Sequence, residues 1–257
     1  MVKTLLKTIV AAVLAVTIPL GSPVIAPNPD AGGAYTDIAD MWFEEAATEY
    51  GYTDIFSDGS GRFNPDNAIT RMEFARLLHR ALGININYFA PVDISEHFTD
   101  VKNDDLGASE LYDLVTAGIV QPGGSFEPDG TLSREEMVLL VLKALDCETG
   151  GEYAVILIMP APFTDDDEIT EAHKSDIYKA VVLGLIKGHE DYSLRPKEAT
   201  TRAEAVTVIS RLVKIIDNLT QRVDVSASMA EENGGLKMTL SIENRTKKAV
   251  TINHTSG

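Results

Sequence analysis

The sequence predicts a mainly α-helical protein of three helical repeats, followed by a short β-stranded tail. The first observation is a motif, Thr/Ser-Arg-x-Glu, that begins at three positions: Thr70, Ser133 and Thr201. A proline stands six residues before each of its arginines. The second observation is a Tyr/Phe-Thr-Asp triplet, also found at three positions: Tyr35, Phe98 and Phe163. Two landmarks that keep their order and near-constant spacing in three copies indicate internal repeats.

Each Thr/Ser-Arg-x-Glu motif is expected to begin a helix. A Thr or Ser followed three residues later by Glu, ahead of an apolar run, is a capping box, in which the hydroxyl and the carboxylate each accept a backbone N–H. Apolar residues then recur at helical spacing, as in Phe74, Leu77, Leu78 and Ala81 of the first copy. The motif therefore predicts three capped, amphipathic helices whose Thr, Ser and Glu side chains stabilise the fold.

The arginine of the motif is not needed for capping. At the first helical position it faces the positive end of the helix dipole, which costs about 0.3–1 kcal/mol. Backbone N–H groups and a guanidinium at this place can together bind a carboxylate or phosphate. The alternative is an ion pair with a carboxylate of a neighbouring repeat. The spacing favours the first interpretation, so three arginines are expected to bind an anion and to contribute little to stability: Arg71, Arg134 and Arg202.

These motifs, together with a Gly-Leu-Ile-x-Gly turn at residues 184–188, resemble the S-layer homology (SLH) domain, which holds surface proteins on bacterial cell walls. The resemblance extends over about residues 35–215. It implies a pseudo-threefold unit of three SLH repeats, at residues 35–83, 98–146 and 163–215, with linkers at residues 84–97 and 147–162. Since a repeat of about 50 residues is too small to form its own core, we expect the three to pack together.

The resemblance also implies a function and a set of site residues. SLH domains bind secondary cell-wall polysaccharide, which often carries pyruvate ketals, in the grooves between repeats. Carried over to this chain, that makes Arg71, Arg134 and Arg202 carboxylate-binding candidates. Lys187 would add a cation, while Gly184 and Gly188 would let a sugar approach the backbone. Trp42 would form a wall of the site, although its position favours the core. The triplet aspartates are expected to be helix caps: Asp37, Asp100 and Asp165.

Three departures from the family pattern put parts of the site in doubt. In repeat 1 the segment from Gly51 to Phe63 is longer than its counterparts, which adds a loop at residues 53–61. In repeat 2, Gln121-Pro122 stands where the family has a second glycine, and in repeat 3 Leu194 replaces the aromatic residue. The added loop begins like an EF-hand calcium loop, but it lacks ligands at its third and twelfth positions, so we predict no metal site.

The N-terminal residues predict export. Two lysines and a short apolar stretch at residues 9–20 precede a small-residue cleavage site, so residues 1–26 are expected to be a signal peptide and residues 27–34 a spacer. The apolar stretch is short for a membrane span, although an uncleaved anchor is the alternative. We therefore expect a secreted protein at the cell wall or cell surface, without a membrane segment after cleavage.

Charge and missing motifs exclude several function classes. The formal net charge of −17 disfavours nucleic acid and anionic lipid, which need Lys and Arg to neutralise phosphates. An anionic polymer would also be repelled at long range, so its recognition requires local positive pockets. The single cysteine, Cys147, cannot form an intramolecular disulfide, and neither the five histidines nor the glutamate pairs have catalytic or metal-binding spacing. We predict no enzyme activity and no cofactor.

Residues 216–257 have a different pattern. Apolar residues alternate at positions 223–229 and 236–242 around an Asn-Gly-Gly turn, and residues 248–252 are a candidate third strand. Residues 236–257 resemble the start of a BsuPI-type proteinase-inhibitor β-sandwich, which is incomplete here because a sandwich needs about seven strands. The alternatives to wall binding are therefore a structural surface-layer or partner-assembly role, including self-assembly, or an exported inhibitor whose activity involves the C-terminal region.

Overall fold

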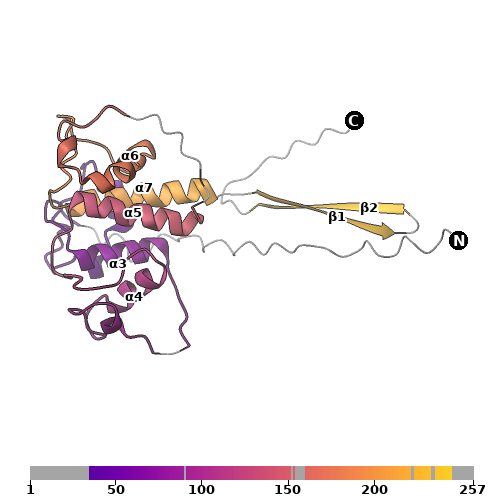
Figure 1. The fold of residues 1–257 in the computed structure, drawn as a ribbon, viewed down its shortest axis with the longest axis horizontal. Helices are drawn as coiled ribbons and strands as arrows, with labels where there is room; N and C mark the ends of the chain where they lie inside the picture. Colours follow the sequence, from indigo (N-terminus) through magenta and orange to yellow (C-terminus); the bar gives the residue numbers. More distant parts are fainter. Residues whose placement is uncertain are drawn as a thin grey trace.

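The computed structural model describes residues 35–89, 91–151, 153, 160–220, 223–232 and 235–244. The signal peptide, the spacer and the third strand predicted above lie outside these residues. The described part is mainly helical, as predicted (Figure 1). Its helices are α1 (Glu44–Tyr50), α2 (Thr53–Phe56), α3 (Arg71–Leu82), α4 (Ala108–Thr116), α5 (Arg134–Thr149), α6 (Lys174–Val182) and α7 (Arg202–Thr220). Short 3-10 turns lie at η1 (Ile94–Glu96), η2 (Asp166–Glu168) and η3 (Glu171–His173).

The three longest helices, α3, α5 and α7, begin at the arginines of the motif, and the predicted capping boxes are confirmed. The Glu73 N–H donates to Thr70 Oγ1 at 3.1 Å, and the Thr70 N–H donates to the Glu73 carboxylate at 2.9 Å. Ser133 with Glu136, and Thr201 with Glu204, make the same reciprocal bonds. Helices α5 and α7 continue beyond the repeat ends expected at residues 146 and 215.

The helices of different repeats pack in a cyclic order. Helix α4 of repeat 2 packs on α3 of repeat 1, and α6 of repeat 3 packs on α5 of repeat 2. Helix α1 of repeat 1 packs on α7 of repeat 3, which closes the cycle. The shared core contains fully buried residues from all three repeats: Ala47, Leu77, Leu78, Leu111, Leu145, Ile177, Ile209 and Leu212. Each sequence repeat therefore buries its first helix against the preceding repeat.

Backbone hydrogen bonds close a smaller ring just before the three long helices. The Ile69 N–H donates to the Thr200 carbonyl at 2.9 Å, and the Thr200 N–H donates to the Leu132 carbonyl at 2.8 Å. The Leu132 N–H donates back to the Ile69 carbonyl at 3.2 Å. Each repeat thus gives one donor and one acceptor to the ring, so that no repeat can be removed without leaving two buried backbone groups unpaired.

The prediction that the triplet aspartates cap the following helices is wrong, because none of their side chains makes a capping hydrogen bond to a described helix. The residue before α1 is Phe43, and α1 has no side-chain cap. Instead, the Asp37 carboxylate accepts the N–H groups of Phe63 and Asn64, at 2.8 and 3.0 Å. Asp100 and Asp165 make the corresponding pairs of bonds in their own repeats. In each case the second donor has a positive φ: Asn64, Glu127 and Arg195. The aspartate therefore holds a left-handed turn in the loop before each long helix.

The added loop of repeat 1 begins with the single-turn helix α2. The Asp54 carboxylate, at the start of the stretch that resembles a calcium loop, forms ion pairs with Arg76 and Arg80 of α3. Phe56 is buried and packs edge-on against Phe63, with 5.3 Å between the ring centroids. The insertion therefore adds to the core of repeat 1 and covers part of its junction with repeat 3.

After α7 the chain forms an antiparallel pair of strands, β1 (Val223–Glu232) and β2 (Gly235–Asn244). The register places Val225 opposite Ile242 and Ala227 opposite Leu240. In Figure 1 the pair follows α7 as a separate ribbon. Among the described helices, none is long and apolar enough to cross a membrane.

We predict that Asp37→Ala lowers the free energy of unfolding by about 2 kcal/mol, because the N–H of the buried Phe63 loses its acceptor. Burial would raise the pKa of Asp37, but the N–H groups of Phe63 and Asn64 and the Arg62 side chain outweigh it and lower the pKa. Urea unfolding at neutral pH measures the loss. The control is Asp104→Ala, since the Asp104 carboxylate is exposed and has no partner among the described residues. Equal losses in both variants would contradict the role of Asp37.

Candidate functional site

The three motif arginines connect the repeats in a cycle. Each donates to the glutamate of the next motif, which already belongs to a capping box. The three N–O distances are 2.7 Å for Arg71–Glu136, 2.9 Å for Arg134–Glu204 and 2.8 Å for Arg202–Glu73. One carboxylate oxygen of each glutamate receives the guanidinium, while the other accepts the N–H of its cap residue. The motif glutamate therefore has a local role and an inter-repeat role.

The N-terminal N–H groups of the long helices are already bonded, so the predicted anion receptor made from them is wrong. In α3, the Arg71 N–H donates to the Gly130 carbonyl and the Met72 N–H to the Pro128 carbonyl, at 2.8 and 3.0 Å. We call the loop that precedes each long helix and carries its proline the proline loop. The first two N–H groups of α5 and α7 likewise donate to carbonyls in the proline loop of the next repeat in the cycle. The loop around each proline thus accepts the first N–H groups of the long helix of another repeat, a role that sequence reasoning missed. Only the guanidinium groups remain as candidate anion donors.

Two of the guanidinium groups are closed in by protein. The Arg134 side chain is 10% exposed, and its Nη2 donates to the Lys187 carbonyl at 2.9 Å. Burial lowers the pKa of Arg134 in spite of the nearby Glu204. The Arg202 side chain is 14% exposed, donates through Nη1 to the Phe56 and Phe63 carbonyls, and lies over the Phe56 ring. In these two copies the arginine is therefore a structural partner of a carboxylate in a neighbouring repeat, which is the alternative that the sequence left open.

Arg71 has a more open environment. Its side chain is 26% exposed, and its Nε donates to the Phe126 carbonyl at 2.8 Å, while Nη1 pairs with Glu136. The guanidinium carbon lies 5.7 Å from the centroid of the Phe126 ring. Among the described residues, Nη2 of Arg71 has no hydrogen-bond partner. Arg71 is therefore oriented by the protein and keeps one donor for another group.

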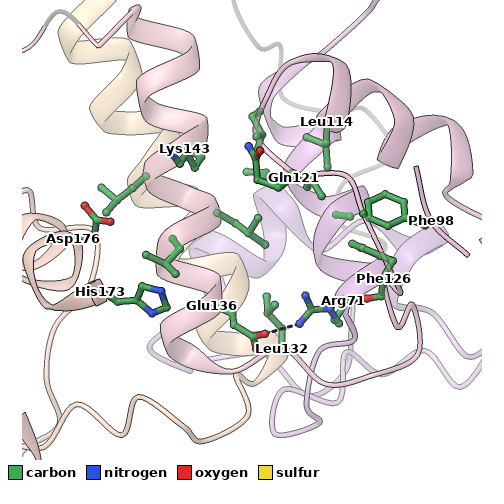
Figure 2. Close-up of a pocket in the computed structure, with 18 of the residues that line it drawn as sticks. Arg71, Phe98, Leu114, Gln121, Phe126, Leu132, Glu136, Lys143, His173 and Asp176 are labelled. Carbon is green, nitrogen blue, oxygen red and sulfur yellow. Dashed lines mark hydrogen bonds and ion pairs between the residues drawn. The ribbon is translucent and has the colours of Figure 1, made fainter. Parts of the chain in front are cut away.

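Arg71 lines a pocket of about 540 Å³ that extends over α5 (Figure 2). Figure 2 shows Arg71 and His173 on opposite sides of the helix that carries Glu136 and Lys143. Much of the lining is apolar: Ala75, Leu78, Phe98, Leu114, Ile119, Val120, Phe126, Leu132, Leu139, Leu140 and Leu142. The polar lining contains both signs of charge: Arg71, Gln121, Ser125, Glu136, Lys143, Asp146, His173 and Asp176.

Lys143 is a pocket cation that the sequence interpretation missed. It is exposed, and its ammonium group has no partner among the residues that the structure describes. A signal for it was present, since each long helix carries a basic residue nine positions after its motif arginine: Arg80, Lys143 and Arg211. Arg80 pairs with Asp54, and Arg211 donates to the Leu185 carbonyl. Lys143 is thus the member of this set without a partner in the described part.

The other predicted site residues do not gather around Arg71. Lys187 is exposed and gives its carbonyl, not its ammonium group, to Arg134. Gly184 has φ +76°, as its turn requires, and a Cβ at Gly188 would come within 2.7 Å of the Phe163 ring. Trp42 is 67% exposed, so its expected place in the core is wrong. The ligand roles of these residues stay predictions. Within the described residues, no His, Cys, Asp or Glu cluster could hold a metal ion.

A buried carboxylate lies next to the pocket. Glu135 is 4% exposed and accepts the Thr170 N–H at 3.1 Å and the Lys197 ammonium group at 3.0 Å. It also pairs with Nδ1 of His173, a pocket-lining residue. Burial would raise the pKa of Glu135, but the hydrogen bonds from His173, Thr170 and Lys197 outweigh it and lower the pKa to about 2. Glu135 therefore connects α5 with the start of α6 as an ionised group.

Comparison with known proteins identifies the repeats. A family model of the S-layer homology domain matches residues 34–75, 97–138 and 162–206, together half of the chain. An exoglucanase, XynX, of Acetivibrio thermocellus is 28% identical over 187 residues, which are 72% of this chain and 17% of that protein. An S-layer protein of Bacillus thuringiensis subsp. finitimus is 24% identical over 96% of this chain and 29% of its own length. A cellulosome-anchoring protein of Acetivibrio thermocellus is 30% identical over 59% of this chain and 33% of its own length. The chain thus spans at most about a third of these relatives.

We predict that Arg134→Ala lowers the free energy of unfolding by about 3 kcal/mol, because it leaves the Glu204 carboxylate without its buried partner. The more exposed Arg71→Ala should cost about 1 kcal/mol or less. Urea unfolding of both variants measures the difference. Lys143→Ala, at an exposed position, is the control and should leave stability unchanged. Equal stability of wild type and Arg134→Ala would restore the expectation that the arginine contributes little to the fold.

We predict that Glu135→Gln weakens the loss of stability in acid. With a folded pKa near 2 and an ordinary value of 4.5, Glu135 contributes stability above pH 4.5 and loses it as the pH falls towards 2. The variant should therefore be less stable than wild type at pH 7, by at most about 3 kcal/mol, and should approach it near pH 2.5. Glu96→Gln, at an exposed glutamate, should keep the wild-type profile. Parallel profiles for wild type and Glu135→Gln would contradict this role.

Proposed function

Because this chain belongs to the S-layer homology family, we propose that residues 35–215 form a non-catalytic module that anchors a protein at the cell surface by binding anionic secondary cell-wall polysaccharide. The observation that carries the proposal is the pocket of Arg71 and Lys143. Arg71 Nη2 and the Lys143 ammonium group are both without a described partner and line the same pocket. In a chain of net charge −17, such a place is where an acidic polymer could be held against the long-range repulsion.

The chemistry of the pocket suits a sugar with an anionic and an apolar substituent. A carboxylate could accept from Arg71 Nη2, which the contacts to Glu136 and Phe126 hold in place. The apolar lining on α5 and the Phe126 ring could cover a methyl group and the C–H face of a pyranose ring. A pyruvate ketal has both a carboxylate and a methyl group, so a pyruvylated polysaccharide is our proposed ligand.

In our proposal the three junctions between repeats contribute unequally. Arg134 and Arg202 use both terminal nitrogens within the protein, and their side chains are at most 14% exposed. They would therefore add little direct charge to ligand binding. Lys187, Gly184, Gly188 and Trp42 remain candidates for weaker contacts outside the main pocket, because three of them are exposed.

The names of the related proteins agree with surface anchoring. They include S-layer proteins and a cellulosome-anchoring protein, and two glucanases match this chain over a small part of their own length. A second candidate is surface-layer assembly, which is favoured by the two S-layer proteins that match 96% of the chain. The likeness of residues 236–257 to an inhibitor sandwich stays a prediction. The pair β1 and β2 is not enough to support an inhibitory function.

We predict that Arg71→Ala and Lys143→Ala each weaken binding to purified cell-wall sacculi about ten-fold, because each removes one charge-assisted contact to the polymer. Sedimentation with sacculi, before and after acid removal of the secondary polysaccharide, measures the affinity. Lys102→Ala has the same change of charge at an exposed lysine that does not line the pocket, and should bind like wild type.

Two results would contradict the proposal. If stripped sacculi pellet the wild-type chain as well as untreated sacculi do, the ligand is not the secondary polysaccharide. If Arg71→Ala and Lys143→Ala bind like Lys102→Ala, the pocket is not the binding site. Concentration-dependent self-association of a chain that does not bind sacculi would favour the assembly alternative.

A further inference from the structure

One position in the proline loops requires a left-handed backbone in all three repeats. Its carbonyl accepts the N–H of the threonine in the Tyr/Phe-Thr-Asp triplet, at 2.9 to 3.0 Å. Repeats 1 and 2 have glycine there, Gly61 with φ +75° and Gly124 with φ +69°. Repeat 3 has Tyr192, with φ +63°. The hydrogen bond keeps the same geometry, so the third copy places a bulky side chain in a conformation that glycine adopts without cost.

A tyrosine in this conformation is strained, and no hydrogen bond or ring contact of its side chain within the described part offsets the strain. Left-handed φ values are rare for bulky residues because Cβ approaches the following carbonyl. The Tyr192 side chain is 77% exposed, and within the described part its ring and hydroxyl group make no ring contact or hydrogen bond. Arg195 is also left-handed, but the Asp165 carboxylate accepts its N–H at 2.7 Å, as in the other repeats. The strain at Tyr192 is peculiar to repeat 3.

The surroundings of Tyr192 are polar, and its backbone is part of a hydrogen-bonded turn. Its N–H donates to the His189 carbonyl, and the His189 N–H donates to the Ser193 carbonyl, so the ring stands on a tight turn. The same segment begins at Lys187, whose carbonyl holds Arg134 at the junction of repeats 2 and 3. Apart from the partly exposed His189, the other exposed or partly exposed side chains of residues 187–198 are charged: Lys187, Glu190, Asp191, Arg195, Lys197 and Glu198. A single ring among charged groups is not an apolar protein-docking patch.

We propose that Tyr192 is a stacking platform for a pyranose ring of the wall polysaccharide, at a second contact separate from the Arg71 pocket. This inference rests on the proposed function for the class of ligand. A pyranose ring has a C–H face that packs on an aromatic face, and hydroxyl groups that suit the tyrosine hydroxyl and the charged neighbours. Because a polymer repeats its sugar units, a weak second contact made by the same polymer lowers the dissociation rate of the first. The strained tyrosine thereby serves binding at the expense of stability.

Two substitutions at Tyr192 test the proposal, with purified sacculi as the probe. Tyr192→Gly should raise the Tm by about 2–4 °C, because it relieves the left-handed strain. It should also weaken binding about five-fold, the loss expected for one aromatic contact. Tyr192→Phe should keep both the wild-type Tm and most of the binding, since the ring remains. Gly124, the glycine at the same position of repeat 2, shows that glycine fits this backbone.

Each outcome decides the proposal. Unchanged binding by Tyr192→Gly overturns the platform, and an equal loss in Tyr192→Phe overturns stacking. A lower Tm for Tyr192→Gly overturns the strain argument. A loss that is equally large on acid-stripped sacculi overturns the polysaccharide as the ligand. Arg71→Ala, measured in parallel, separates the two claims: if Arg71→Ala loses binding and Tyr192→Gly keeps it, only the platform is wrong.

Discussion

The structure depends on one interaction made three times, the ion pair between a motif arginine and the motif glutamate of the next repeat. The arginine stands at the positive end of a helix, where its charge is mildly unfavourable. The glutamate compensates, because it already lies at a helix start as part of a capping box. The order Arg71–Glu136, Arg134–Glu204, Arg202–Glu73 closes on itself. Folding each long helix is thereby coupled to the docking of its neighbour, which small repeats without separate cores require.

The same cycle explains why the three junctions differ in what they can bind. The ion pair uses one arginine nitrogen, and carbonyl groups of the neighbouring loops accept from the other nitrogens to a different extent at each junction. At Arg202 the α2 insertion places Phe56 over the guanidinium, and at Arg134 the turn at Lys187 supplies a carbonyl. At Arg71 no such group reaches Nη2 among the described residues, and the pocket extends from there to Lys143. Departures from the repeat pattern, rather than the motif itself, therefore distinguish the candidate binding site.

Strain is distributed in the same unequal way. In all three repeats the residue directly before the conserved-spacing proline is left-handed, namely Asn64, Glu127 and Arg195. In each case an aspartate carboxylate accepts two backbone N–H groups there and compensates for the strain. Repeat 3 adds the left-handed Tyr192 without a compensating contact of its side chain. Structural positions are thus stabilised by bonds within the protein, whereas exposed Tyr192 and Lys143 keep groups available to a partner outside it.

The sequence by itself determined the helical class, the three repeats and the helix starts, because capping boxes and apolar periodicity are local and depend on residues within about four positions. Only the tertiary structure decided the partners of the arginines, since Glu136 lies 65 residues from Arg71 and Glu73 lies 129 from Arg202. It also turned Asp37, expected as a cap of the following helix, into an acceptor for residues 26 and 27 positions away. The exposure of Trp42 and the unpaired ammonium group of Lys143 within the described part could not be predicted from the sequence either, because both depend on which surfaces of the three repeats pack together.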